Sequence, residues 1–257
     1  MIRTEVIHRS TLLITMDRVD RMNALDADAY ADLSDAWTRL RDDQALTSAI
    51  VTGAGTKAFC AGADVKSYLP SPEPLENMWM TQRGQLLNNG LEVWKPVIAA
   101  VNGYCLGGGM TLLLATDIRV ASPNATFGVT EVKRGLVPGN GGTQRMLEQL
   151  PYPLAMELLL TGDSIEADTA LSWGLINKIV DQDQLMDTAI QYVDRIESNA
   201  PLAVQATKEL AIRARDLDRS TGLRVEKMFN RLLWCSKDAQ EGPTAFAEGR
   251  PPRFGSA

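Results

Sequence analysis

Two glycine-rich turns are the clearest candidates for chemistry in this 257-residue chain. The stretch GYCLGGGMTLLLATD (103–117) places Gly107, Gly108 and Gly109 side by side in front of an apolar run. Each glycine costs roughly 0.5–1 kcal/mol relative to alanine in regular structure, so this density indicates that something approaches the backbone closely. A second turn of small residues, FCAGAD (59–64), lies about 45 residues earlier.

Three interpretations account for such turns. A phosphate-binding loop is disfavoured because the chain contains neither GxGxxG nor GxxxxGK[ST]. Close packing of a helix against a strand would explain one or two of the glycines. In the third interpretation, unpaired N–H groups from both turns converge on one point and stabilise an oxyanion. Loss of one such donor typically costs about 3 kcal/mol in a transition state.

The remaining reactive side chains narrow the chemistry. His8 is the only histidine, and it lies in a strand-like stretch, so histidine triads and histidine-based metal sites are disfavoured. Cys60, Cys105 and Cys235 are widely spaced and form no CxxC, which indicates neither a disulfide framework nor a zinc site. The acid or base of an enzyme with this sequence would be a carboxylate, lysine, tyrosine or cysteine.

Charge and hydropathy exclude several classes of partner. The net charge is −6, which argues against a nucleic-acid partner, and the basic residues of KELAIRARDLDR (208–219) are interleaved with acids as on a solvated face. No apolar run approaches the roughly 20 residues of a membrane span. The N-terminal MIRTEVIHRS carries charges where a signal peptide would be apolar. We therefore expect a cytoplasmic protein with no membrane or nucleic-acid partner.

Strands and helices alternate through most of the chain and predict an α/β fold. A hairpin is expected around Arg9-Ser10, followed by a helix that Asp26 caps. Further on, 96–122 has the pattern of a strand, a glycine turn, a short buried helix and another strand. The other expected elements are a strand at 47–55, a loop at 68–74, and helices over about 75–94 and 143–150.

The last part of the chain is expected to be helical. From 183 to about 248 the pattern is almost wholly that of helices, with breaks near 199–201 and at Gly242-Pro243. We expect a core over residues 1–199 and a helical segment over 200–257. Apolar residues on more than one face of this segment fit packing against its own core or against another subunit.

The two turns and their surroundings resemble the crotonase family, the enoyl-CoA hydratases and isomerases. The resemblance is carried by KAFCAGADVKSY (57–68) and by the long stretch from KPVIAAVNGYCLGGG through GLVPGNGGTQRM (95–146). It extends to RMNAL (21–25), SWGLINKIV (172–180), APLAVQATKEL (200–210) and KDAQEGPTAFAEGRPPRF (237–254). It implies a crotonase-like (ββα)n spiral core and a C-terminal helical trimerisation segment. The glycines would then let a thioester carbonyl reach the backbone.

The resemblance also implies functional positions. The N–H groups of Ala63 and Gly108 would form an oxyanion hole for an acyl-CoA thioester, with Glu131 as the acid–base group. Lys66 matches a position close to the CoA phosphates, although a solvated lysine explains it equally well. The other positions expected along the substrate path are Asn23, Ala24, Leu25, Ala61, Asp64, Gly107, Met110, Gly139 and Asn140.

One position departs from the family pattern. Hydratases of the family use two glutamates, and the first of them is replaced here by Thr111, whose hydroxyl cannot act as a general base near neutral pH. Thr111, Thr130 and Asn140 could supply polar groups or could only satisfy local backbone. We expect Glu131 to lie in an apolar pocket formed by Met110, Leu136 and the 75–94 segment, which would raise its pKa.

Several functions remain open at this point. Isomerisation and hydration of an enoyl-CoA are nearly level, because the missing carboxylate disfavours hydration while its frequency in the family favours it. A hydratase-lyase, a thioester hydrolase and a non-catalytic acyl-CoA binder are the alternatives. The resemblance further implies a homotrimer or homohexamer, with no cofactor beyond the coenzyme A of the substrate. Phe246, Arg250 and Arg253 could approach a CoA across an interface.

Overall fold

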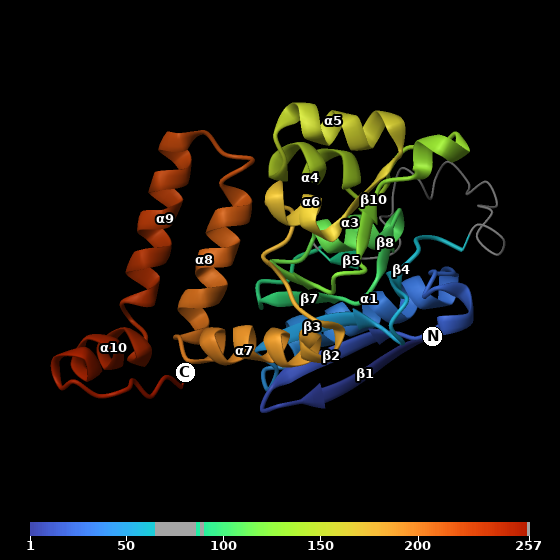
Figure 1. Cartoon of the computed structure of the whole chain (residues 1–257). Helices are drawn as coiled ribbons and strands as arrows, with labels where there is room; N and C mark the ends of the chain where they lie inside the picture. The colour runs from blue at the N-terminus through green and yellow to red at the C-terminus, as the bar shows by residue number, and fades with distance from the viewer. Residues whose placement is uncertain (65–85, 88–89, 256–257) are drawn as a thin grey trace. The chain divides into compact units, whose positions relative to one another are not determined.

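The computed structural model describes residues 1–64, 86–87 and 90–255, which form a mixed α/β chain (Figure 1). Two compact units are present, residues 1–93 with 97–190, and residues 94–96 with 191–257. The main segment of the second unit begins at residue 191, which lies within a helix. The division expected between residues 199 and 200 stays a prediction.

Two sheets organise the first unit. The six-stranded sheet has the order β1 (Ile2–Ile7), β2 (Thr11–Met16), β3 (Ser48–Gly53), β7 (Val97–Val101), β9 (Ile118–Ala121) and β12 (Lys178–Ile179). The four-stranded sheet has the order β11 (Ser164–Glu166), β10 (Thr126–Gly128), β8 (Tyr104–Leu106) and β4 (Ala58–Cys60). Only the pairs β1–β2 and β10–β11 are antiparallel. Strands β3 and β7 are buried along their whole length, as expected for parallel strands covered on both faces.

The chain alternates between the two sheets, which is the expected ββα repeat. Strands β3, β7 and β9 of the first sheet are followed by β4, β8 and β10 of the second, and β8 leads directly into helix α3 (Gly108–Leu114). The crossing points are tight: a Cβ on Gly53 would lie 2.3 Å from the Ala58 carbonyl oxygen, and one on Gly103 would lie 2.1 Å from that of Lys57. The predicted fold class is therefore confirmed.

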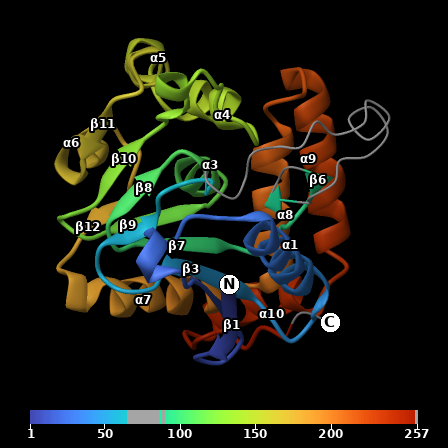
Figure 2. The same cartoon turned by 90° about the vertical axis from the view of Figure 1, so that its right-hand side faces the viewer.

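Helices cover the two sheets of the first unit. Helix α1 (Ala27–Asp42) begins at its predicted cap, where the Asp26 carboxylate accepts a hydrogen bond from the Ala29 N–H at 2.9 Å, and it contacts β1 and β2. Helices α4 (Gly142–Gln149), α5 (Tyr152–Thr161) and α6 (Ala167–Ser172) lie beside the second sheet (Figure 2). Short 3-10 turns occur at η1 (Val19–Arg21), η2 (Glu131–Arg134) and η3 (Gln182–Gln184).

The helix predicted over about 75–94 is wrong at its C-terminal end. The described residues 86–87 and 90–94 include two short strands, β5 (Leu86–Leu87) and β6 (Gly90–Leu91), which pair in parallel. Gly90 has φ +80°, a conformation that ends a right-handed helix and that glycine adopts without strain. Most of the remaining predicted helix, and the loop predicted at 68–74, lie outside the described residues.

The C-terminal helices follow the prediction only in part. After α7 (Leu185–Glu197), the predicted break precedes α8 (Pro201–Arg213), and α9 (Arg219–Leu233) packs on α8. The break predicted at Gly242-Pro243 is wrong, because α10 (Lys237–Ala247) continues through Pro243 and buries Ala245. The real breaks precede Asp218 and Ser236, whose side chains cap α9 and α10.

Within the described ranges, no helix is both long and apolar enough to cross a lipid bilayer. The cytoplasmic location stays a prediction.

Candidate active site

The two glycine-rich turns lie against each other because the strands before them are neighbours. Strands β4 and β8 pair in parallel, with Cys60 opposite Cys105, so their carboxyl ends meet at one edge of the sheet. A Cβ on Gly62 would lie 3.2 Å from the Gly108 nitrogen, and one on Gly108 would lie 3.5 Å from the Ala63 nitrogen. Segments about 45 residues apart therefore bring two backbone amides together.

Both amides are left without an acceptor by the local backbone. The Leu25 N–H donates to Gly62 and the Asp64 N–H donates to Leu25, which places the Ala63 N–H outside this ladder. Gly108 is the first residue of α3, where no carbonyl of the helix is available. Among the described residues neither N–H donates a hydrogen bond. Two converging N–H donors of this kind can stabilise an oxygen on which negative charge develops.

The Glu131 carboxylate lies beside these turns. Glu131 begins the 3-10 turn that follows β10. A Cβ on Gly107 would lie 3.5 Å from Oε1 of Glu131, and Gly107 itself has φ +52°. The Oε2 atom is buried and has no hydrogen-bond partner within the described ranges of the chain. Burial raises the pKa of this carboxyl, and its own backbone N–H and Arg134 oppose the shift. An acid–base group with a raised pKa thus adjoins the two amides.

The pocket expected around Glu131 is wrong in one member. Leu136 is 58% exposed, because its N–H closes the turn onto the Glu131 carbonyl at 3.1 Å while its side chain faces outward. Met110 is fully buried in the core of the first unit, so its contact with a substrate stays a prediction. Thr130 is held by Arg134, which donates to its hydroxyl at 3.0 Å and to its carbonyl at 3.1 Å.

Thr111 lies one turn into α3 and is 4% exposed. Its hydroxyl donates to the Gly108 carbonyl at 3.0 Å, and its methyl group lies 2.6 Å from where a Cβ on Gly142 would be. The hydroxyl proton is therefore used by the backbone, while the oxygen lone pairs can still accept a hydrogen bond.

The nearby cysteines are poor nucleophiles. Burial raises the pKa of Cys60 to about 12, and the pKa of the buried Cys105 is also raised. Both are therefore protonated at neutral pH, when the thiol is not the reactive form. No cluster of three or more His, Cys, Asp or Glu side chains suited to a metal ion occurs in the part of the chain that the structure describes.

A narrow cavity of about 20 Å³ opens next to the Gly108 amide. Helix α3 contributes Gly108, Thr111, Leu112 and Ala115 to its wall, and the predicted site residues Leu25 and Asn140 also line it. Leu86 and Leu87 on β5 belong to the 75–94 segment that was expected to line the pocket. Sequence reasoning missed Tyr30, Leu33 and Trp37 on α1 and Arg145 on α4. Tyr30 is the closest of these to the amides, because a Cβ on Gly108 would lie 2.8 Å from its hydroxyl oxygen.

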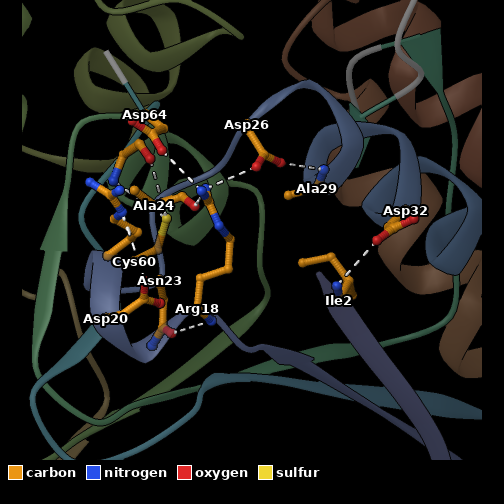
Figure 3. Close-up of polar contacts among 12 residues, drawn as sticks. Ile2, Arg18, Asp20, Asn23, Ala24, Asp26, Ala29, Asp32, Cys60 and Asp64 are labelled. Carbon is orange, nitrogen blue, oxygen red and sulfur yellow. Dashed lines mark hydrogen bonds and ion pairs between the residues drawn. The ribbon is translucent and has the colours of Figure 1, made fainter. Parts of the chain in front are cut away.

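Three of the predicted substrate-path residues surround Arg18 (Figure 3). The guanidinium donates to the Ala24 carbonyl at 2.7 Å and to Asp64 at 3.0 Å. The buried Asn23 accepts from the Arg18 N–H and donates to the carbonyls of Ala54 and Ala58. These side chains hold the first glycine turn in place, and contacts between them and a substrate stay predictions.

The remaining predicted positions are dispersed. The Ala61 N–H donates to Met22 at 3.0 Å in the first turn. Gly139 is exposed, and Asn140 has φ +53° and accepts from Arg145 through its carbonyl at 2.8 Å. Lys66 lies outside the described residues.

The ββα repeat and a carboxylate beside two free amides define the class of protein. Residues 7–257 match the family model described as enoyl-CoA hydratase/isomerase, and the chain belongs to this family, the crotonases. Among named relatives, it is 42% identical to (E)-benzylidenesuccinyl-CoA hydratase of Thauera aromatica and 40% identical to carnitinyl-CoA dehydratase of Proteus mirabilis, with 95% of both chains covered in each case. An enoyl-CoA hydratase from Mycobacterium marinum has a similar structure, with a TM-score of 0.91, 39% identity and coverage of 100% of this chain and 99% of the other. The chain is an enzyme of this family.

Proposed function

We propose that this enzyme adds water reversibly to a 2-enoyl-CoA, a CoA thioester whose double bond is conjugated with the thioester carbonyl. The observation that carries the proposal is the unpartnered, buried Oε2 of Glu131 next to the turns that expose the Ala63 and Gly108 amides. Two relatives are named as a hydratase and a dehydratase, which supports addition or removal of water as the type of reaction.

In the proposed reaction one carboxyl group handles both protons. Glu131 takes a proton from water as the water oxygen bonds to C3 of the enoyl group. The electron pair of the double bond moves toward the thioester, and the N–H groups of Ala63 and Gly108 stabilise the enolate oxygen. Protonated Glu131 then gives the proton to C2. The raised pKa of Glu131 suits both steps, because it brings proton uptake and release toward neutral pH.

Isomerisation is the second candidate, and Thr111 is the observation that favours it. A double-bond shift needs one proton-carrying group and an enolate site, so a chain without the second carboxylate retains all the groups required. Glu131 would take a proton from C2 of a 3-enoyl-CoA and return it to C4.

Incubation with 2-enoyl-, 3-enoyl- and aromatic enoyl-CoAs, with products identified by mass, tests the proposal. A gain of one water on the 2-enoyl substrates is the expected result. An unchanged mass with a moved double bond would instead establish isomerisation, release of an aldehyde would establish a hydratase-lyase, and release of free CoA would establish a hydrolase. Tight binding without any product would identify a binding protein and overturn the proposal.

The variant Thr111→Val tests whether the Thr111 hydroxyl takes part in the reaction or only supports the local backbone. We expect it to lower kcat by no more than about threefold, because the hydroxyl proton is donated to the Gly108 carbonyl of its own helix and valine keeps the shape of the side chain. Steady-state kinetics on the substrate identified above measure the effect. A fall of a hundredfold or more would show that the hydroxyl takes part in the reaction.

We propose that the enzyme works as a homotrimer or as a pair of trimers, with no cofactor beyond the CoA of its substrate. Exposed apolar side chains in the second unit support this proposal: Leu223, Met228, Leu232, Trp234 and Phe246. Arg250 is held by Glu241 and Glu248 in its own chain, so Phe246 and Arg253 are the better candidates for a role at a neighbour's CoA. Light scattering on the purified protein checks the assembly, and a monomer would contradict it.

A further inference from the structure

Trp37 carries an unusual buried polar group. Its side chain is 0% exposed, and its buried indole N–H has no hydrogen-bond partner among the residues that the structure describes. Buried N–H groups in folded proteins are almost always paired, so an orphaned one requires an explanation. A donor that finds no acceptor in the described part of its chain is suited to an acceptor that arrives with a ligand.

The position of Trp37 indicates that the substrate could bring this acceptor. Trp37 forms part of the wall of the cavity that also includes Gly108, Leu33 and Tyr30. The three α1 residues are spaced i, i+3 and i+7, so they lie on one face of the helix. The Tyr30 hydroxyl adjoins Gly108, and therefore the cavity connects the amide end of the site with the indole.

The wall of this cavity limits the chemistry of the group that it can accept. Apart from the polar groups already described, it is formed by leucine and alanine side chains, and its volume of about 20 Å³ has room for a group the size of one water molecule. Thr111 and Arg145 also line the cavity, and both donate to backbone carbonyls. The indole N–H of Trp37 is a buried donor without a partner among the described residues, and a neutral donor of this kind matches a neutral acceptor.

We propose that this cavity is a subsite for a neutral acceptor oxygen, such as a ketone or ether oxygen, carried on the acyl group of the substrate. The Trp37 indole N–H donates the hydrogen bond that holds this oxygen. The inference rests on the proposed function for the position of the thioester at Ala63 and Gly108. It makes Trp37 a specificity-determining residue that selects oxygenated acyl groups over hydrocarbon ones.

Binding of saturated acyl-CoAs to the full-length protein tests the proposal without requiring turnover. One ligand has a plain hydrocarbon chain, and a series of equal length carries a ketone at successive positions along the chain. We expect the best ketone to bind about fivefold more tightly than the hydrocarbon, the effect of one hydrogen bond of ordinary net strength. Trp37→Phe should abolish this preference, so that ketone and hydrocarbon ligands bind equally tightly, whereas the control Trp173→Phe, outside the cavity wall, should keep it.

The indole resonance provides a second readout. In protein labelled with ¹⁵N-tryptophan, the Trp37 N–H signal should shift further with the best ketone than with the hydrocarbon ligand. If Trp37→Phe does not fold, the signal can be assigned by elimination from phenylalanine variants of the other tryptophans, Trp79, Trp94, Trp173 and Trp234.

Three results would overturn the subsite: equal affinity for ketone and hydrocarbon ligands, a preference that survives Trp37→Phe, or equal shifts of the indole signal. Equal shifts would point to a resident water as the acceptor. Failure of the proposed function looks different. In that case the ketone preference would be present, while no enoyl-CoA would gain water or Glu131→Gln would retain full turnover.

Discussion

Glu131→Gln is expected to lower kcat for hydration about a thousandfold while leaving acyl-CoA affinity within a few-fold of the original. General acid–base groups contribute roughly 10²–10⁴ in rate, and here one carboxyl carries both proton transfers. Glutamine has nearly the same shape, so the amides of Ala63 and Gly108 remain able to bind the thioester oxygen. Steady-state kinetics together with a binding titration check both halves of the prediction. Undiminished turnover would remove Glu131 from the mechanism.

The same substitution should stabilise the fold at neutral pH. Burial raises the pKa of Glu131 above its ordinary value of 4.5, so the folded protein holds this proton more tightly than the unfolded chain does. Well below pH 4.5 the carboxyl is protonated in both states. As the pH rises through the folded-state pKa, the wild-type protein must ionise a partly desolvated group and loses stability relative to the glutamine variant.

Thermal unfolding from pH 4 to pH 8 measures this effect. We expect the advantage of Glu131→Gln to grow with pH to on the order of 1 kcal/mol, the cost of one poorly satisfied buried acceptor. Glu5→Gln, at an exposed position on β1, is the matched control and should show no comparable trend. Loss of activity together with a gain of stability is the pattern of a group retained for function. A variant that is less stable at pH 8 would show that the carboxylate supports the fold.

The sequence contains enough information to place the amide side of the site. A strand followed by small residues occurs twice, and parallel strands put such turns at one sheet edge, so the proximity of Ala63 and Gly108 follows from pattern and pairing together. Asp26 could be predicted as a cap because its role depends on neighbours a few residues away. Asp218 and Ser236 show the same local signal, which would have located the helix breaks that were missed.

The cavity next to the Gly108 amide could not be predicted in the same way. Tyr30, Leu33 and Trp37 have the spacing of any helix that packs on a core, and nothing in that spacing distinguishes a core face from a cavity wall. Whether the Trp37 indole N–H has an acceptor depends on all the elements packed around it, which the local sequence does not reveal. At Gly90 a positive φ is incompatible with the expected helix, and the chain instead pairs with β5 four residues earlier.

Gly108→Ala is expected to lower kcat about a hundredfold or more with a smaller effect on stability. Gly108 does not have a positive φ, so alanine fits the backbone itself. The added methyl would lie 2.8 Å from the Tyr30 hydroxyl and 3.5 Å from the Ala63 nitrogen, in the space next to both free amides. Loss of one donor from an oxyanion site typically costs this much in rate.

Two other glycine-to-alanine variants serve as controls that separate an effect on the amides from an effect on the fold. Gly109→Ala would put a methyl 2.3 Å from the Cys60 carbonyl oxygen, so it should destabilise the fold by about 3 kcal/mol or more through overpacking against β4. Gly222→Ala, in α9 with nothing within 4 Å, should change neither rate nor fold adversely.

The double variant Gly108→Ala/Tyr30→Phe decides how the methyl acts. Removing the hydroxyl relieves the close contact, so stability should return toward that of Tyr30→Phe alone, as measured by thermal unfolding. Activity should stay low, because the methyl still occupies the place of the thioester oxygen beside the Gly108 and Ala63 amides. Recovery of turnover in the double variant would mean that the glycine is needed only to make room for Tyr30, and the two amides would then lose their proposed part in catalysis.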